Sequence, residues 1–309
     1  MTGRNVVGFV DRKAKNTIVI GAHYDHLGWG DENSLSEEKA IHNGADDNAS
    51  GVAALLSIAE QLKGISLGNN ILFIAFSGEE KGLLGSNFFV KNSTVDVASF
   101  NYMINMDMVG RLDENRRLAI YGVGTSPSFI PSLNTIDNPS FQFKMDSSGV
   151  GPSDHTSFYF ENVPVLHFFT GQHAQYHKPE DDVELINFDG LTDVSVFISK
   201  LINKLEPESR LVFNKTGEPE EVKRSFKVTL GIMPDYLFTG KGLMISGVKE
   251  NRPGAIGGLL KGDIIIKMGG EDINSMSDYM QALNMFSPGE EIKVVVDRGG
   301  KKTTKKIML

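Results

Sequence analysis

The stretch that decides the fold of this chain is Phe73-Ile74-Ala75-Phe76-Ser77-Gly78-Glu79-Glu80, in which an apolar strand leads directly into two adjacent carboxylates. Packing does not require acidic side chains at the end of a buried strand, so we expect this strand to deliver chemistry. Three other strand-like runs end similarly: residues 17–20 lead into His23 and Asp25, residues 102–106 into Asp107, and residues 163–169 precede His177. The four strand ends therefore point toward one site.

The order of the expected elements indicates an α/β fold. Apolar runs rich in β-branched or aromatic residues at 16–22, 70–76, 102–106 and 163–169 predict strands, and helical patterns lie among them. The clearest helix follows residues 47–51, with Asn48 or Ser50 as its cap, and a second at 191–205 is expected to close the first domain. In open α/β sheets the ligand site lies beyond the carboxyl ends of the strands, so residues that follow several strands meet there.

Length and composition indicate two domains and exclude several classes of protein. The chain has 309 residues, and its composition shifts to Glu, Pro, Lys and Gly after the second helix. We therefore expect a first domain at 1–206, a linker at 207–225 and a second domain at 226–309. No apolar run approaches the roughly 20 residues of a membrane helix, so no membrane span is expected. The net charge of −8, with scattered Lys and Arg, argues against a nucleic-acid partner.

Cysteine usage and the first residues limit the metal chemistry and leave the compartment open. The chain has no cysteine, so any metal site must use nitrogen and oxygen ligands. Residues 1–10 already read as a strand, without a charged start followed by an apolar signal segment. Either the protein is cytosolic, or its native start precedes this sequence.

The polar residues beyond the strands predict a metal centre. His23, Glu79, Glu80, Asp107 and His177 all lie at strand ends or in neighbouring loops, and the polar turn at 43–48 adds further acids. Carboxylates gathered in this way would repel one another or take up protons unless a cation lies among them. The expected cation is a divalent metal ion, and the number of ligands favours two.

These motifs resemble the co-catalytic zinc peptidases, the family of bacterial leucyl aminopeptidases and of the catalytic domain of glutamate carboxypeptidase. The matching motifs occur in family order: His23-Tyr24-Asp25, Gly44-Ala45-Asp46-Asp47-Asn48-Ala49-Ser50-Gly51, Glu79-Glu80 with Gly82-Leu83-Leu84-Gly85-Ser86, Asn105-Met106-Asp107, Ser153-Asp154-His155, and His177 with Asp181. The resemblance implies a mixed central sheet flanked by helices. It also favours an exported, periplasmic or extracellular protein.

The resemblance further implies the roles of the site residues. His23 and Asp107 would bind one Zn²⁺, Glu80 and His177 the other, and Asp47 both, with a cis peptide between Asp47 and Asn48. Glu79 would be the general base acting on a metal-bridged water. Asp25 would orient the His23 ring, and Asp181 the His177 ring.

Other polar residues have structural interpretations. We expect Asp46 to be a turn or cap residue, and His26, His42 and His173 to be rim or hydrogen-bonded structural histidines. His167, on an apolar strand, is expected to be a satisfied core residue. The loop that holds Ser153, Asp154 and His155 could either line a substrate pocket or support the metal ligands.

The second domain resembles a PDZ domain of the kind attached to bacterial proteases. The resemblance rests on residues 228–232, 242–245, 252–255, 259–265 and 288–290. PDZ domains bind extended peptides at a sheet edge and hold the terminal carboxylate in a backbone nest, which Leu230, Gly231 and Ile232 would supply here. The alternative is a domain that packs on the first or has lost its ligand.

The leading hypothesis is a zinc-dependent aminopeptidase that acts on peptide substrates. A dipeptidase or carboxypeptidase of the same family would share the metal ligands, because specificity lies in loops. Glutaminyl cyclisation on a related single-zinc scaffold is disfavoured by the complete ligand set. A non-catalytic, metal-bound peptide-binding protein is disfavoured by Glu79, which no ligand role requires.

Overall fold

The chain divides into two compact units, Met1–Thr216 and Gly217–Leu309. The computed structural model describes residues 2–30, 33–138, 140–206, 210–216, 228–235, 238, 240–249, 251–274 and 276–309. Residues 207–209 and 217–225 of the expected linker lie outside the described residues. The backbone N–H of Leu211 donates to Asn101 Oδ1, and the carbonyl of Thr216 accepts from the Tyr159 hydroxyl, so both residues belong to the first unit. Within the described ranges, no helix combines the length and the apolar character that crossing a membrane demands.

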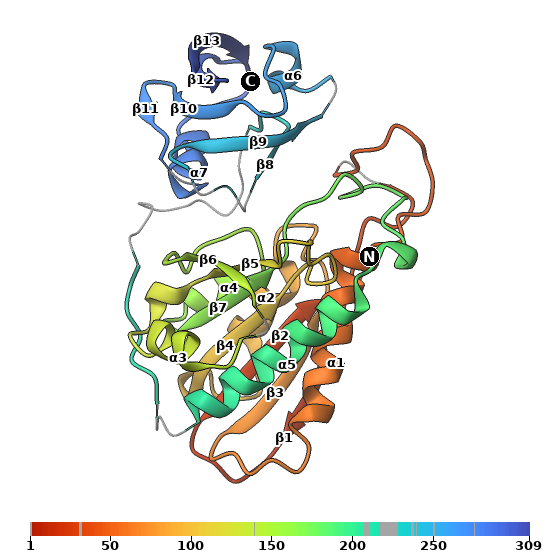
Figure 1. Cartoon of the computed structure of the whole chain (residues 1–309), viewed down its shortest axis with the longest axis vertical. Helices are drawn as coiled ribbons and strands as arrows, with labels where there is room; N and C mark the ends of the chain where they lie inside the picture. The colour runs from red at the N-terminus through yellow and green to blue at the C-terminus, as the bar shows by residue number, and fades with distance from the viewer. Residues whose placement is uncertain are drawn as a thin grey trace. The chain divides into compact units, whose positions relative to one another are not determined.

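A mixed sheet forms the centre of the first unit, with the strand order β1-β3-β2-β4-β7-β5-β6 (Figure 1). β3, β2, β4 and β7 are parallel neighbours, whereas β1 pairs antiparallel with β3, and β5 with β7. The carboxyl ends of four strands therefore share one edge. The strands are β1 (Val6–Val10), β2 (Thr17–His23), β3 (Asn70–Phe76), β4 (Phe100–Met106), β5 (Arg117–Tyr121), β6 (Gln142–Asp146) and β7 (Val165–Phe169).

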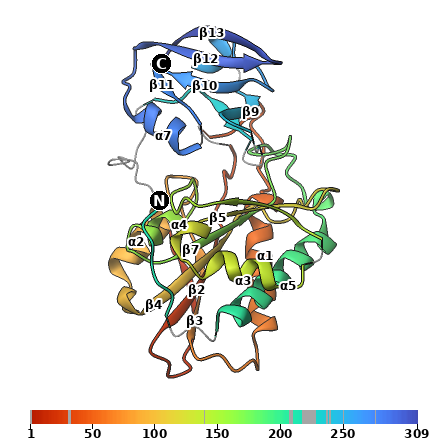
Figure 2. The same cartoon turned by 60° about the vertical axis from the view of Figure 1, so that its left-hand side comes forward.

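Helices cover both faces of this sheet. α1 (Gly51–Gln61), α3 (Phe129–Thr135) and α5 (Phe188–Leu205) lie on one face, and α2 (Leu84–Asn92) and α4 (His155–Tyr159) on the other (Figure 2). The first layer buries the apolar stripes of α1 and α5 against the strands, and the second buries aromatic side chains of α2 and α4. The short helical turns are η1 (Ala45–Ser50), η2 (Val97–Ser99), η3 (Val123–Thr125) and η4 (Val183–Leu185).

The predicted mixed α/β architecture is confirmed. β3 has the predicted bounds, and β2, β4, β7, α1 and α5 overlap the runs in which strands and helices were expected. Asn48 Oδ1 accepts the N–H of Gly51, the first residue of α1, at 3.0 Å, whereas the Ser50 hydroxyl donates to the carbonyl of Asp46. The peptide bond between Asp47 and Asn48 is cis, as expected.

The second unit is rich in β-structure, as predicted. Its strands are β8 (Ile232–Pro234), β9 (Leu243–Val248), β10 (Ile264–Met268), β11 (Glu271–Asp272), β12 (Glu291–Arg298) and β13 (Lys301–Met308), and its helices are α6 (Pro253–Ile256) and α7 (Met276–Asn284). The strand order is β13-β12-β10-β9-β8, with β11 on β10. The buried carboxylate of Asp263 accepts from Arg298 Nε at 2.6 Å and Nη2 at 2.7 Å, so this internal acid is paired.

Candidate metal centre

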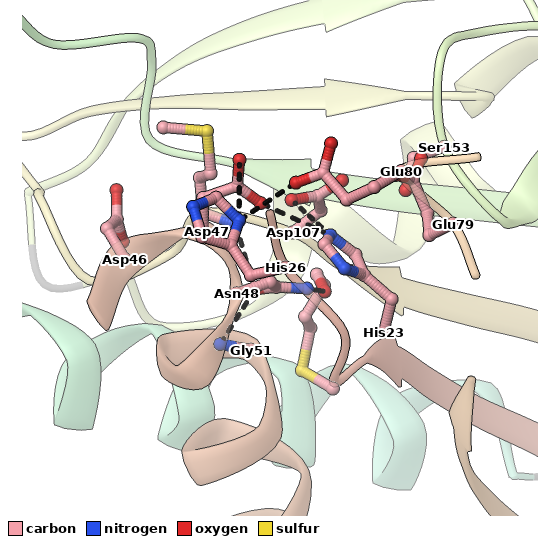
Figure 3. A network of polar contacts seen from close by, with 12 residues as sticks. His23, His26, Asp46, Asp47, Asn48, Gly51, Glu79, Glu80, Asp107 and Ser153 are labelled. Atoms are coloured by element: carbon pink, nitrogen blue, oxygen red, sulfur yellow. Dashed lines mark hydrogen bonds and ion pairs between the residues drawn. The ribbon is translucent and has the colours of Figure 1, made fainter. Parts of the chain in front are cut away.

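The parallel strands bring the predicted ligands to one edge of the sheet. β2 ends at His23 beside the end of β3, which leads into Glu79 and Glu80, while β4 ends just before Asp107. Asp47 comes from η1, which opens α1 next to these strands. Figure 3 shows the carboxylates of Asp47, Glu80 and Asp107 between the rings of His23 and His26.

Asp47 lies between the two predicted metal-binding histidines. Its Oδ1 is 3.4 Å from His23 Nε2, and its Oδ2 is 3.3 Å from His177 Nε2. His23 Nε2 is also 3.3 Å from Asp107 Oδ1, and His177 Nε2 is 3.2 Å from Glu80 Oε2. The structure thus brings all the predicted ligands together and gives Asp47 one oxygen for each half of the site.

The hydrogen bonds of the two histidines fix which ring nitrogen faces the carboxylates. His23 Nδ1 lies 3.1 Å from the carbonyl oxygen of Asp25, and His177 Nδ1 lies 2.9 Å from that of Asn33. A carbonyl oxygen only accepts, so each Nδ1 carries the hydrogen. In the neutral rings, each Nε2 then turns a lone pair toward two carboxylates, which is the arrangement of a metal ligand.

The charges of this cluster also indicate a cation. Against the effect of burial, hydrogen bonds to Asp47 and Glu80 raise the pKa of His177 to about 10. Burial by itself would raise the pKa of both carboxylates. The neighbouring histidines nevertheless lower the pKa of Asp47 and that of Glu80 to about 2. The acids therefore remain charged, and the protein retains protons on the imidazoles to balance them. Divalent metal ions, for which nitrogen and oxygen donors are suitable ligands, would replace those protons.

Glu79 lies beside the ligands without joining either group of them. Burial raises the pKa of Glu79 well above its ordinary range, while the charge of His23 opposes this and that of Asp107 adds to it. Its backbone N–H donates to Asp25 Oδ1 at 3.1 Å, and the N–H of Glu80 donates to Asp25 Oδ2 at 3.4 Å. The side chain of Asp25 thus holds the Glu79–Glu80 backbone, and it is the carbonyl of Asp25 that orients His23.

The expected partnership of Asp181 with His177 is wrong. Asp181 Oδ2 accepts the N–H groups of Asp46 and Asp47, each at 3.0 Å, whereas the His177 ring is oriented by the Asn33 carbonyl. Asp181 therefore fixes the backbone that carries the shared ligand. The sequence places Asp181 close to His177, but it does not reveal which backbone groups require an acceptor.

Asp46 has a structural role, as expected. Its side chain points away from the cluster (Figure 3), and its Oδ1 accepts the N–H of Gly110 at 2.7 Å. His173 Nε2 lies 3.3 Å from Asp46 Oδ2. His42 likewise has local partners, with Nδ1 at 3.0 Å from the Ala40 carbonyl and Nε2 at 2.8 Å from the Ser34 hydroxyl.

Ser153, Asp154 and His155 lie buried behind the site. Asn105 Nδ2 donates to Ser153 Oγ at 2.8 Å, and burial raises the pKa of Asp154 to about 7. The His155 ring stacks on that of His167 with centroids 4.5 Å apart, and all three residues of the motif are at most 1% exposed. Such burial favours support of the metal ligands over lining an open pocket.

His26, which the sequence analysis assigned to the rim or to a structural hydrogen bond, lies within the site. The structure places its Nδ1 at 2.9 Å from Glu80 Oε1, inside the cluster rather than at a rim. The ligand atoms of His23, Asp47 and Asp107 lie within 4.8 Å of one another, and so do those of His26, Asp47 and Glu80. The signal for His26 was its position in the loop that follows the His23 strand end.

In the second unit, the predicted carboxylate-binding loop leads into β8. Leu230 is fully buried in the core, Gly231 has a φ of +67°, and Ile232 pairs with Val248. The N–H of Gly231 donates to Thr229 Oγ1 at 3.0 Å. A side chain at Gly231 would place its Cβ 2.3 Å from Arg252 Cβ, so glycine is required both by the conformation and by the neighbour.

Comparisons with known proteins agree with this geometry. The model of peptidase family M28 matches residues 5–202, and that of the PDZ domain matches residues 215–309. The chain is 26% identical to Aminopeptidase YwaD of Bacillus subtilis (strain 168) over 73% of this chain and 48% of that protein. It is 32% identical to a probable leucine aminopeptidase of Arthroderma otae over 61% of this chain and 53% of that protein.

A solved structure extends the similarity to the fold. BSAP, a zinc aminopeptidase from Bacillus subtilis, matches with a TM-score of 0.55 and 26% identity, covering 69% of this chain and 53% of that chain. The chain spans about half the length of the relatives it matches.

Proposed function

Since the chain belongs to peptidase family M28, we propose that it is a zinc-dependent aminopeptidase that hydrolyses the N-terminal peptide bond of its substrates. The observation that carries the proposal is the position of Asp47, whose two oxygens lie 3.4 Å from His23 Nε2 and 3.3 Å from His177 Nε2. The relatives named as aminopeptidases support the same activity.

In this proposal the protein holds two Zn²⁺ ions. His23 and Asp107 would bind one, Glu80 and His177 the other, and Asp47 both. When bound, the metal pair supplies a Lewis acid for the scissile carbonyl and lowers the pKa of water toward about 7.

Glu79 is the proposed general base. Its carboxylate would take a proton from the attacking water and pass it to the leaving amine. The pKa of Glu79, raised by burial, favours the second transfer, because the protonated form persists until the amine departs. Asp25 would keep the backbone of Glu79 in place through its hydrogen bond to the N–H.

Metal-stripped and zinc-restored protein, assayed with amino-terminal and carboxy-terminal reporter substrates, tests this function. We expect amino-terminal activity only after zinc is restored, and a loss of about 10²- to 10⁴-fold in Glu79→Gln. Zinc content should be unchanged in that variant, and Glu180→Gln, an exposed acid, serves as the matched control. Full activity of Glu79→Gln would dismiss the base, and full activity without metal would dismiss the metalloenzyme.

A carboxypeptidase or dipeptidase specificity is the second candidate, favoured by Arg111. Arg111 Nη1 is buried without a hydrogen-bond partner in the parts of the chain that the structure describes, while Nη2 donates to Gln175 Oε1 at 3.4 Å. An unpaired guanidinium nitrogen could receive a substrate carboxylate. Hydrolysis confined to carboxy-terminal reporters, and its loss in Arg111→Ala, would select this candidate over the aminopeptidase.

We also propose that the PDZ domain binds the C-terminus of a peptide through Leu230, Gly231 and Ile232. The positive φ of Gly231 is consistent with a backbone nest for a carboxylate. Fluorescence polarisation of the full chain with one peptide, carrying either a free or an amidated C-terminus, tests it. Binding only of the free acid is expected, and equal behaviour of the two peptides contradicts the assignment.

A further inference from the structure

We propose that His26 is an additional ligand of the metal ion assigned to Glu80 and His177, an inference that rests on the proposed metal centre. His26 Nδ1 is 2.9 Å from Glu80 Oε1 and 3.9 Å from Asp47 Oδ2. Donors at about 2.0–2.2 Å from a shared zinc, in tetrahedral geometry, lie roughly 3.3–3.6 Å from one another. The two His26 distances lie on either side of this range, the one to Glu80 below it and the one to Asp47 above it.

His177 completes the same set of donors. Its Nε2 is 3.2 Å from Glu80 Oε2 and 3.3 Å from Asp47 Oδ2. Each oxygen of Glu80 thus faces a different imidazole, and the side chain of Glu80 is only 5% exposed. Two nitrogen and two oxygen donors give four protein ligands, the number that zinc has in closed sites.

The ring of His26 is held in place by its neighbours. A Cβ at Gly44 would lie 2.7 Å from both Cγ and Cδ2 of His26, so the glycine leaves the space that the ring occupies. The His177 ring lies edge-on at a centroid distance of 5.9 Å, and the His26 side chain is 9% exposed. The imidazole is therefore fixed with Nδ1 toward the cluster, as a preorganised ligand requires.

Within the described ranges, no other polar group competes for the His26 ring. Among the residues that the structure describes, the buried Nε2 of His26 has no hydrogen-bond partner. The polar contacts that the described residues make with the ring are those of Nδ1 with Glu80 and Asp47. With Nδ1 as the ligand atom, Nε2 would carry the ring hydrogen.

This assignment makes the two halves of the centre unequal. The half with His26 has four protein ligands, whereas the half with His23, Asp47 and Asp107 has three and keeps a position open for water or substrate. We therefore expect sequential zinc binding, with the four-ligand half filled first.

X-ray absorption spectroscopy and zinc titration of the full chain test the proposal. With one equivalent of zinc, the wild type should show two imidazoles per metal ion and His26→Gln one. Glutamine can still donate to Glu80 but is a poor zinc ligand, so the tighter zinc affinity should fall by at least about 100-fold, beyond the usual cost of losing an outer-shell partner. His42→Gln is the matched control and should retain both affinities.

Each result has a distinct meaning. One imidazole in the one-zinc wild type, or an unchanged tight affinity in His26→Gln, would overturn the role of His26 while leaving the proposed function intact. A wild-type chain that binds no zinc would overturn the proposed function and this ligand with it.

Discussion

Replacing Asp181 should destabilise the first unit far more than its position outside the ligand set suggests. Asp181 is fully buried, and its Oδ2 accepts the N–H groups of Asp46 and Asp47 at 3.0 Å each. Hydrogen bonds to a charged group contribute about 1.5–3 kcal/mol each, and unpaired buried donors cost about 1–3 kcal/mol each. Relief of the desolvation of the carboxylate offsets part of this loss. We expect Asp181→Ala to lower the free energy of unfolding by about 2–4 kcal/mol.

Asp181→Asn separates charge from geometry. The amide oxygen can still accept both N–H groups, so only the charge-dependent part is lost, and we expect about half the effect of Asp181→Ala. The neighbouring Asp182, which accepts from the exposed Asn43 Nδ2 at 2.6 Å, provides the control, since Asp182→Ala should cost less than about 1 kcal/mol.

Urea and thermal unfolding of metal-stripped protein would measure these effects without a contribution from bound metal. For a unit of this size, 1 kcal/mol corresponds to about 2–4 °C, so the Tm of the first unit should fall by roughly 4–16 °C in Asp181→Ala. If Asp181→Ala unfolded at the same urea concentration and temperature as Asp182→Ala, the backbone of Asp46 and Asp47 would not depend on the Asp181 carboxylate, which would refute this explanation.

Two further predictions concern close packing and pH. In Gly51→Ala, the new Cβ would lie 2.3 Å from Asn48 Oδ1 and 2.6 Å from the Met106 carbonyl oxygen, so we expect the free energy of unfolding, measured in urea, to fall by about 1–3 kcal/mol. The control is Gly8→Ala, whose Cβ meets nothing closer than 3.9 Å and which should be nearly neutral. Equal effects of the two substitutions would contradict the steric reason. Burial raises the pKa of Asp154 from 3.8 to about 7, so between these two pH values the folded, metal-free protein holds a proton that the unfolded chain has lost. The free energy of unfolding should therefore fall as the pH rises from about 4 to about 7. Asp154→Asn should remove this pH-dependent fall, which amounts to up to about 4 kcal/mol between pH 4 and 7. If the free energy of unfolding of Asp154→Asn changed with pH as in the wild type, Asp154 would not be the group responsible.

The sequence predicted the central elements well because they are buried on both sides. The apolar run at 70–76 became β3 with the same bounds, and the acids that follow it lie where the parallel strands end. By contrast, β6 is an edge strand whose residues are partly or fully exposed, so Gln142–Asp146 carries little apolar signal. α4 has 5 residues and is too short for a helical period to be evident.

The candidate ligands were predictable as residue types at strand ends, but their contacts were not. Apart from the position of His26 just after the strand that ends at His23, the sequence does not distinguish a histidine that faces Glu80 from one that bonds to a serine, such as His42. The space over Gly44 that receives the His26 ring exists only in the folded loop. Tertiary geometry decides these roles.

Asp25 and Asp181 share a role that explains why the site contains more acids than ligand positions. Asp25 accepts the N–H groups of Glu79 and Glu80, and Asp181 accepts those of Asp46 and Asp47. In both cases one carboxylate spans two successive backbone donors, and the second donor belongs to a proposed ligand. A loop segment lacks the regular hydrogen bonds of a helix or strand, so an internal acceptor of this kind both satisfies its N–H groups and fixes the direction of the ligand side chain. The negative charge that holds each loop also adds to the field that attracts a cation to the centre.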